Sequence, residues 1–262
     1  MSRESAAGSD VCPETGPPRN LKLLLEYDGT AYSGWQRQAN GLSIQQVLEE
    51  AIGRIAGQGV QVVGSGRTDA GVHALGQVAH CRLHSRISVR NLLLGINSLL
   101  PPDIALLALE EAPLTFHARF DTQRKSYIYR ICNRPVRPAL ERHRTWFVWT
   151  PLDLTAMRDA AQVFLGEHDF TSFCSTHTGS RDRVRTVYSL TVEQNPEGMI
   201  LIFLEANGFL RYMVRTIVGA LVEVGQGKAS PAGIAAILAA KDRRLAGLTV
   251  PPHGLYLKDV TY

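Results

Sequence analysis

The order of the apolar segments in the first half of the chain limits its possible folds more than any other feature. Short apolar runs, which predict strands, occupy residues 21–27, 60–63, 77–83 and 104–109. A stretch with helical spacing of apolar residues follows the first run, beginning after Ser43 and ending at Gly57. A second such stretch, residues 88–100, ends at two prolines. The order strand, helix, strand, strand, helix, strand is that of a ferredoxin-like βαββαβ unit.

The second half of the chain shows a looser version of the same order. Its predicted strands are residues 125–131, 145–149, 184–192, 199–206 and 255–260, and its predicted helices are residues 153–165, 209–224 and a shorter one after Ser230. We therefore predict an α+β fold in which two ferredoxin-like halves form a continuous mixed or antiparallel sheet with helices packed on it. The predicted division is a flexible N-terminal tail (1–20), an N-terminal half (21–112) and a C-terminal half (113–262).

The composition fits a globular protein with a sizeable core. The 262 residues are 45% hydrophobic and 20% charged, with a formal net charge of +4, which suits one large domain or two ordinary ones. No apolar run approaches the roughly 20 residues of a membrane span. Residues 1–20 carry acids and no apolar core, so neither a secretory nor a transit peptide is predicted. The four cysteines are far apart and match no metal-binding spacing, which predicts reduced thiols, a cytoplasmic location and no metal site.

Residues 64–74, which we call the glycine-rich turn, place three glycines, Arg67 and Asp69 between two predicted strands. The turn has the outer spacing of a phosphate-binding loop but lacks its Lys-Ser/Thr pair. Asp69 also stands where a dinucleotide-binding motif needs its third glycine. The sequence therefore argues against both kinds of nucleotide site. Two interpretations of Asp69 remain: it caps a following helix, or it projects into a cleft as a catalytic carboxylate.

Arginines and aromatic residues alternate along residues 116–144. Positive charge follows a phosphate backbone and aromatic rings stack on bases, so this pattern favours nucleic-acid binding over a merely solvated surface. The RNA-contacting residues that the sequence suggests are Arg119, Arg124, Lys125, Arg181, Arg183 and Arg211. Arg215 lies near the apolar face of the predicted helix 209–224. There it either reaches solvent, or pairs with a carboxylate such as Asp69 and lowers the pKa of that carboxyl.

Five groups of residues, taken together, resemble a known family. They are GRTDAGVHA at 66–74, FHARF with YxY at 116–129, GxHDFxxF from 166, NxFL with MVRxIVG at 207–219, and GLYL at 254–257. They occur in the order of the tRNA pseudouridine synthase A (TruA) family, and the resemblance covers about residues 21–262.

The resemblance implies an isomerase that converts uridine to pseudouridine in the anticodon stem-loop of tRNA, at tRNA positions 38, 39 and 40, without a cofactor. It implies that Asp69 is the catalytic nucleophile or base on a flipped-out uridine, and that Arg215 forms an ion pair with it. Tyr127 and Arg67 would bind the substrate. A homodimer and a catalytic cleft between the halves are also implied. The residues alone leave two other functions open: an RNA-binding module without catalysis, and a hydrolase of free nucleosides.

Overall fold

The computed structural model describes residues 16–176 and 180–262. Its first half contains β1 (Pro18–Tyr27), α1 (Ile44–Ala56), β2 (Val62–Gly64), β3 (His73–His84), α2 (Val89–Leu99) and β4 (Ile104–Ala112). Its second half contains β5 (Arg124–Asn133), β6 (Trp146–Val148), α3 (Leu154–Ala161), β7 (Gly166–Asp169), β8 (Val184–Gln194), β9 (Met199–Ala206), α4 (Met213–Gly225), α5 (Pro231–Ala240) and β10 (Leu255–Thr261). Short 3-10 helices occupy Gly29–Ala31, Gln162–Phe164, Thr171–Phe173 and Pro252–Gly254.

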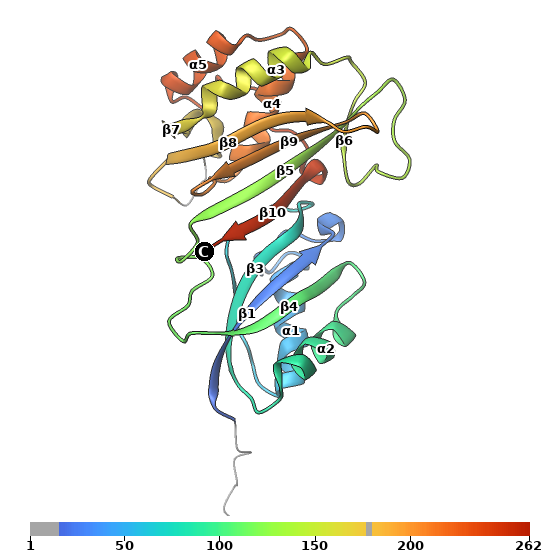
Figure 1. Ribbon diagram of the computed structural model, residues 1–262, viewed down its shortest axis with the longest axis vertical. Coiled ribbons are helices and arrows are strands. Elements are labelled where there is room, and N and C mark those ends of the chain that lie inside the picture. The colour runs from blue at the N-terminus through green and yellow to red at the C-terminus, as the bar shows by residue number, and fades with distance from the viewer. Residues whose placement is uncertain (1–15, 177–179) are drawn as a thin grey trace, which may run out of the picture.

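One sheet runs through the molecule in the order β4-β1-β3-β10-β5-β9-β8-β7 (Figure 1). In addition, β2 pairs with β3 and β6 pairs with β5. The order β4-β1-β3-β2 in the first half is the fourth-first-third-second pattern of a ferredoxin-like unit. The order β10-β5-β9-β8 repeats that pattern in the second half. The predicted α+β fold, with two ferredoxin-like halves in one continuous sheet, is confirmed.

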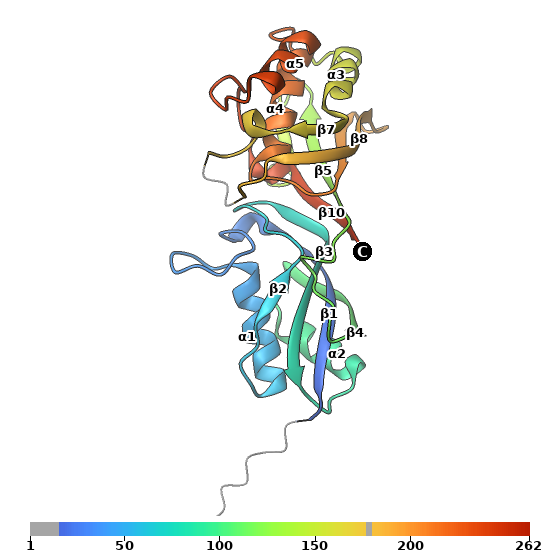
Figure 2. The ribbon, with the colours of Figure 1, turned by 90° about the vertical axis from the view of Figure 1, so that its left-hand side faces the viewer.

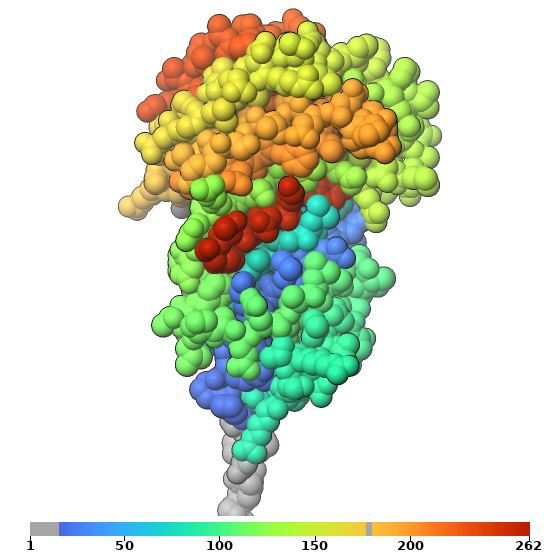
Figure 3. Space-filling view, viewed as in Figure 1, coloured from blue at the N-terminus to red at the C-terminus, as the bar shows by residue number. Residues whose placement is uncertain are grey.

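β10 joins the two halves. It runs antiparallel to β5 of its own half and parallel to β3 of the first half, where Tyr256 pairs with His73 and Leu257 pairs with Ala74. The space-filling view shows this last strand at the surface between the two halves (Figure 3). Because the paired residues of β3 directly follow Asp69 and its neighbours, the joint holds the glycine-rich turn beside the second half.

α1, α2 and α5 begin where their capping serines predict. The hydroxyl of Ser43 accepts a hydrogen bond from Gln46 N at the start of α1, and Gly57 ends the helix at a φ of 65°. Ser88 and Ser230 cap α2 and α5 in the same way. Figure 2 shows α1 and α2 in one half and α3, α4 and α5 in the other. Their apolar faces cover a core that includes the fully buried Leu21, Leu23 and Leu25 of β1, together with Phe164, Phe170, Phe173 and Ile217 in the second half.

Some boundaries differ from the predicted ones. β1 begins at Pro18, inside the predicted N-terminal tail, and residues 1–15 of that tail lie outside the described residues. β7 was not predicted, because its sequence Gly-Glu-His-Asp is polar. α4 begins at Met213, four residues later than predicted.

Cys81, Cys132 and Cys174 are buried and form no disulfide, while Cys12 lies outside the described residues. Across residues 16–176 and 180–262, no helix is both long and apolar enough to cross a membrane.

Candidate active site

Hydrogen bonds to its neighbours hold the glycine-rich turn in one conformation. Thr68 takes part in two of them: its carbonyl accepts from Trp35 N over 3.0 Å, and its hydroxyl lies 2.9 Å from the Tyr27 hydroxyl. The amide of Gln77 donates to Gly66 O over 3.0 Å. The element that follows Asp69 is a strand, β3, which begins at His73 within the glycine-rich turn, so no helix begins there for Asp69 to cap. The capping interpretation is therefore wrong, and the carboxylate projects into a cleft.

The structure of the turn requires glycine at two of its positions, 71 and 64. Gly71 has a φ of 76°, which side-chain-bearing residues rarely adopt. Gly64 faces the indole of Trp35, and a Cβ added there would lie 2.5 Å from a ring atom. Packing therefore requires glycine at the end of β2.

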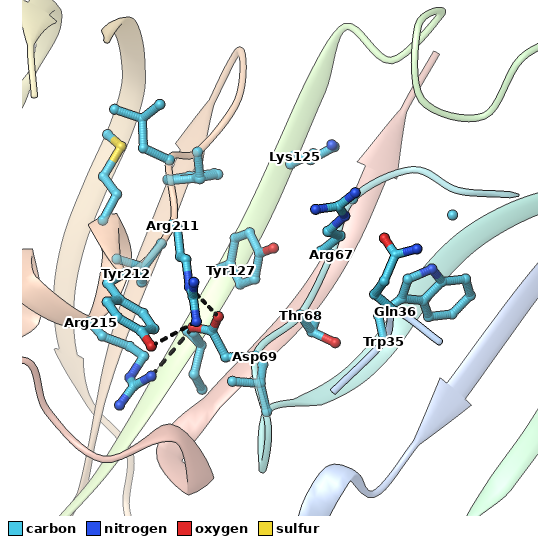
Figure 4. Close-up of a pocket in the computed structure, with 18 of the residues that line it drawn as sticks. Trp35, Gln36, Arg67, Thr68, Asp69, Lys125, Tyr127, Arg211, Tyr212 and Arg215 are labelled. Atoms are coloured by element: carbon cyan, nitrogen blue, oxygen red, sulfur yellow. Dashed lines mark hydrogen bonds and ion pairs between the residues drawn. The ribbon is translucent and has the colours of Figure 1, made fainter. Parts of the chain in front are cut away.

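Two arginines from the second half reach Asp69 (Figure 4). Arg215 Nη1 lies 3.3 Å from Asp69 Oδ2, and Arg211 Nε lies 3.8 Å from Asp69 Oδ1. Arg215 also donates from Nε to Val250 O over 2.7 Å, and its side chain is only 13% exposed. Of the two predicted alternatives for Arg215, the structure has the ion pair and not the solvent-reaching side chain.

The pKa of Asp69 departs from the sequence-based expectation. Burial raises it, and the attraction to Arg215 and then to Arg211 lowers it, with a net result above the ordinary value for aspartate. The expected depression by Arg215 is therefore wrong in its net direction, because desolvation of the carboxylate outweighs both arginines. A raised pKa makes this carboxylate a stronger base than an exposed aspartate.

Tyr127 and Arg67 line the same cleft as Asp69. Tyr127 lies on β5, is 7% exposed, and packs edge-to-face on Phe209 with ring centroids 5.0 Å apart. Burial raises the pKa of its hydroxyl well above the ordinary value, so the hydroxyl stays protonated. Arg67 is exposed on the glycine-rich turn. Figure 4 shows both side chains at the cleft beside Asp69.

The cleft has a volume of about 1320 Å³ and is lined by residues of both halves. Four of the six predicted RNA-contacting residues line it, namely Arg119, Lys125, Arg181 and Arg211. Arg124 and Arg183 are not among the described residues that line it, and Arg124 instead pairs with Glu205 over 3.0 Å. Arg185, which is absent from the predicted set, lines the cleft. The result is a concave surface rich in positive charge.

Lys125 occupies an unusual position in this cleft. Its Nζ donates to Ser65 O over 2.5 Å, which ties β5 to the glycine-rich turn. Burial, with added repulsion from Arg119 and Arg185, lowers the pKa of Lys125 to about 8. The sequence indicated the positive charge but not its burial.

Tyr212, like Arg185, is a cleft residue that sequence reasoning missed. It was expected inside a helix, but it precedes α4 with a φ of 67°. No local signal in the sequence predicts this conformation. Within the part of the chain that the structure describes, no group of three or more His, Cys, Asp or Glu side chains is placed to hold a metal ion.

Comparison with known proteins identifies the family. A family model described as tRNA pseudouridine synthase matches residues 24–121 and 160–262. The chain belongs to the tRNA pseudouridine synthase family. The two matched segments include Arg67, Asp69 and Arg215, whereas Tyr127 lies between them. Tyr127 nevertheless lies in the same cleft as Asp69 and Arg215.

Curated relatives support the same family. A protein of Caldicellulosiruptor bescii is 46% identical over 246 residues, which cover 93% of this chain and 100% of the relative. Relatives from Brevibacillus brevis and Geotalea daltonii are 48% and 45% identical over 244 residues, again 93% of this chain and all of each relative. All three are named tRNA pseudouridine synthase A.

Proposed function

We propose that this protein isomerises uridine to pseudouridine in the anticodon stem-loop of tRNA. The observation that carries the proposal is the half-buried carboxylate of Asp69, which two arginines contact in a basic cleft between the halves. Family membership supplies the reaction type. The cytoplasmic location and the homodimer that the sequence resemblance implies belong to the same proposal, and sedimentation equilibrium tests the dimer.

The isomerisation breaks the N1–C1′ bond, turns the uracil and joins C5 to C1′; C5 then loses its proton and N1 gains one, so the product is an isomer of the substrate. Asp69 either attacks C1′ or C6 as a nucleophile, or removes a proton from C2′ as a base. All three routes need a carboxylate anion close to the reacting atom, which is C1′ or C2′ of the ribose or C6 of the uracil. Arg215 and Arg211 stabilise that anion and fix its orientation, because each contacts one of its two oxygens.

Access to Asp69 requires that the target base leave the helical stack. Flipping a nucleotide out of a stem costs a few kcal/mol. The ring of Tyr127 offers the flipped uracil a stacking surface, and the exposed Arg67 lies on the turn where it can fill the vacated space. Arg119, Arg181 and Arg185 supply positive charge for the flanking phosphates.

Replacement of the carboxylate tests the proposal directly. We expect Asp69→Asn to abolish pseudouridine formation while tRNA affinity stays within about threefold, since the amide keeps the size of the side chain but cannot act as nucleophile or base. Carbodiimide modification of tRNA followed by primer extension maps the product as a reverse-transcription stop. The matched control is Asp159→Asn, an exposed aspartate on α3, which should behave as wild type. A retained stop with Asp69→Asn would refute the assignment.

The same assay separates the two other functions. An RNA-binding module would leave every uridine unmodified even with the wild-type protein. A nucleoside hydrolase would release ribose from free uridine, and we expect no such release.

A further inference from the structure

Tyr212 precedes α4 in a backbone conformation that tyrosine rarely adopts. Its φ is 67° and its ψ is −1°, and among the described non-glycine residues only Lys241 shares a positive φ. Such conformations are unfavourable, persist where the surroundings hold them, and gather at functional sites. The Tyr212 side chain makes no capping hydrogen bond to the helix. Helix capping therefore does not account for the conformation.

The ring of Tyr212 lies against both guanidinium groups that reach Asp69. The guanidinium carbon of Arg211 is 4.8 Å from the ring centroid, and that of Arg215 is 5.1 Å from it. Both distances are in the range of cation–π attraction. Arg211 Nη2 also donates to the Tyr212 hydroxyl over 3.1 Å. Figure 4 shows the three side chains gathered at Asp69.

The two arginines need such support to different degrees. Arg215 is held by Val250 O and by Asp69. The side chain of Arg211 is 52% exposed, and its contact to Asp69 is the longer one at 3.8 Å. Two neighbouring guanidinium groups also repel each other, and a free arginine has many rotamers. An aromatic ring in contact with both offsets the repulsion and limits the rotamers.

We propose that Tyr212 is a positioning residue for the isomerisation, whose ring holds Arg211 and Arg215 against Asp69. The inference rests on the proposed function, because it takes Asp69 as the catalytic carboxylate. Among residues 16–176 and 180–262, the charged and titratable groups that face Asp69 are Arg211, Arg215 and Tyr127. Since both arginines lower the pKa of Asp69 against the effect of burial, loosening them raises it further and moves the acid limb of the activity profile to higher pH.

Three substitutions separate the ring from the backbone conformation. Tyr212→Phe keeps the ring. Tyr212→Asn removes the ring but tolerates a left-handed backbone, and Tyr212→Gly is the second ring-free variant in case the first does not fold. For the Asn and Gly variants we expect kcat to fall about tenfold while KM changes less than about threefold. Tyr212→Phe and the control Lys241→Asn, which changes the other left-handed residue, should stay within about threefold of wild type.

A second measurement is independent of turnover. The titration of Asp69 can be followed by NMR of its ¹³C-labelled carboxyl carbon, with Asp69→Asn to assign the signal. We expect a higher midpoint in the Asn and Gly variants than in wild type. An unchanged midpoint, or a loss in Tyr212→Phe as large as in Tyr212→Asn, would overturn the positioning role. A raised midpoint with unchanged kcat would support the positioning of the arginines but contradict the proposed function, because Asp69 would then not carry the reaction.

Discussion

The ammonium group of Lys125 lies in the cleft and is partly desolvated. Its pKa of about 8 lies below the ordinary 10.5 because burial disfavours the charged form. The unfolded chain therefore binds this proton more tightly than the folded chain, so the folded protein gains stability as pH rises from about 8 towards 10.5. At neutral pH the charge remains, and its burial together with the repulsion from Arg119 and Arg185 costs about 3 kcal/mol. Such a cost is consistent with a residue kept for contact with an anionic substrate.

Substitution of this lysine should separate stability from function. We expect Lys125→Met to raise the free energy of unfolding at pH 7 by about 2 kcal/mol, the burial cost less about 1 kcal/mol for the lost hydrogen bond to Ser65 O. The same variant should bind tRNA more weakly and with a smaller salt dependence, because the cleft has lost one positive charge. Urea denaturation and tRNA titrations at several salt concentrations measure both.

The matched control for this prediction is Lys258→Met. Lys258 is an exposed lysine on β10, so its removal should leave the free energy of unfolding nearly unchanged. If Lys125→Met is less stable than wild type, the lysine acts as a structural tie to the glycine-rich turn, and the burial argument fails.

At the scale of elements, local signals predict much of the fold and long-range contacts decide the rest. The starts of α1, α2 and α5 follow from Ser43, Ser88 and Ser230, because a cap acts within one turn of its helix. The delayed start of α4 does not follow from a local signal. The left-handed Tyr212 before this helix contacts Arg211, and Arg211 contacts Asp69, which lies 143 positions before Tyr212 in the chain. β3 likewise begins at His73, inside the glycine-rich turn, because β10 pairs with it there.

The residues of the candidate site likewise divide into those that the sequence predicts and those that depend on long-range contacts. The carboxylate and its arginine partner could be predicted from residue type and motif. Which arginines of the basic stretches face the cleft could not, because neighbouring residues on a strand point to opposite faces and the register is set by pairing. Thus Lys125 of β5 lines the cleft, whereas the adjacent Arg124 does not.

The packing of Gly64 on Trp35 gives a prediction at the scale of the turn. A Cβ at this position would lie 2.5 Å from the indole, and Trp35 is buried and hydrogen-bonded to Thr68 O. We expect Gly64→Ala to lower the free energy of unfolding by about 1–3 kcal/mol and also to reduce kcat, because the displaced strand end carries the glycine-rich turn. Thermal unfolding and single-turnover assays check the two effects.

Gly59→Ala is the comparison for this change. An added Cβ there has no atom within 4 Å, so the variant should match wild type in both measurements. Unaltered stability and turnover in Gly64→Ala would show that the indole can move aside and that the turn is not fixed by this contact.

The whole molecule depends on the joint between its halves, and His73 lies in that joint. The side chain is 2% exposed; Nδ1 accepts from Gly29 N over 3.1 Å, and Nε2 faces the carbonyls of His143 and His253 at 3.1 and 3.2 Å. A single neutral imidazole, protonated at Nε2, thus connects the end of β1 with two segments of the second half. Its ring also stacks on Tyr256 of β10, with centroids 4.6 Å apart.

This arrangement predicts how the protein responds to acid. Burial lowers the pKa of His73 below its ordinary 6.5, outweighing the attraction of Asp28, while Arg144 adds a small decrease. As pH falls, the unfolded chain therefore binds this proton before the folded chain does. The stability that neutral His73 contributes is lost as pH falls from about 6.5 through the lowered pKa of His73 in the folded protein. The loss approaches about 1.4 kcal/mol per pH unit for this one proton.

Replacement of the His73 imidazole should weaken the dependence of the free energy of unfolding on pH. We expect His73→Gln to be less stable than wild type near pH 7.5, since it loses the stacked ring, but to lose less stability on acidification to about pH 5. Denaturant unfolding at several pH values gives both slopes. His143→Gln, which changes an exposed side chain and keeps the backbone carbonyl, should retain the wild-type slope. The pKa values of His80 and His253 are also lowered by burial, so some slope remains in every variant. Parallel curves for wild type and His73→Gln would mean that acid acts on the joint through those histidines and not through His73.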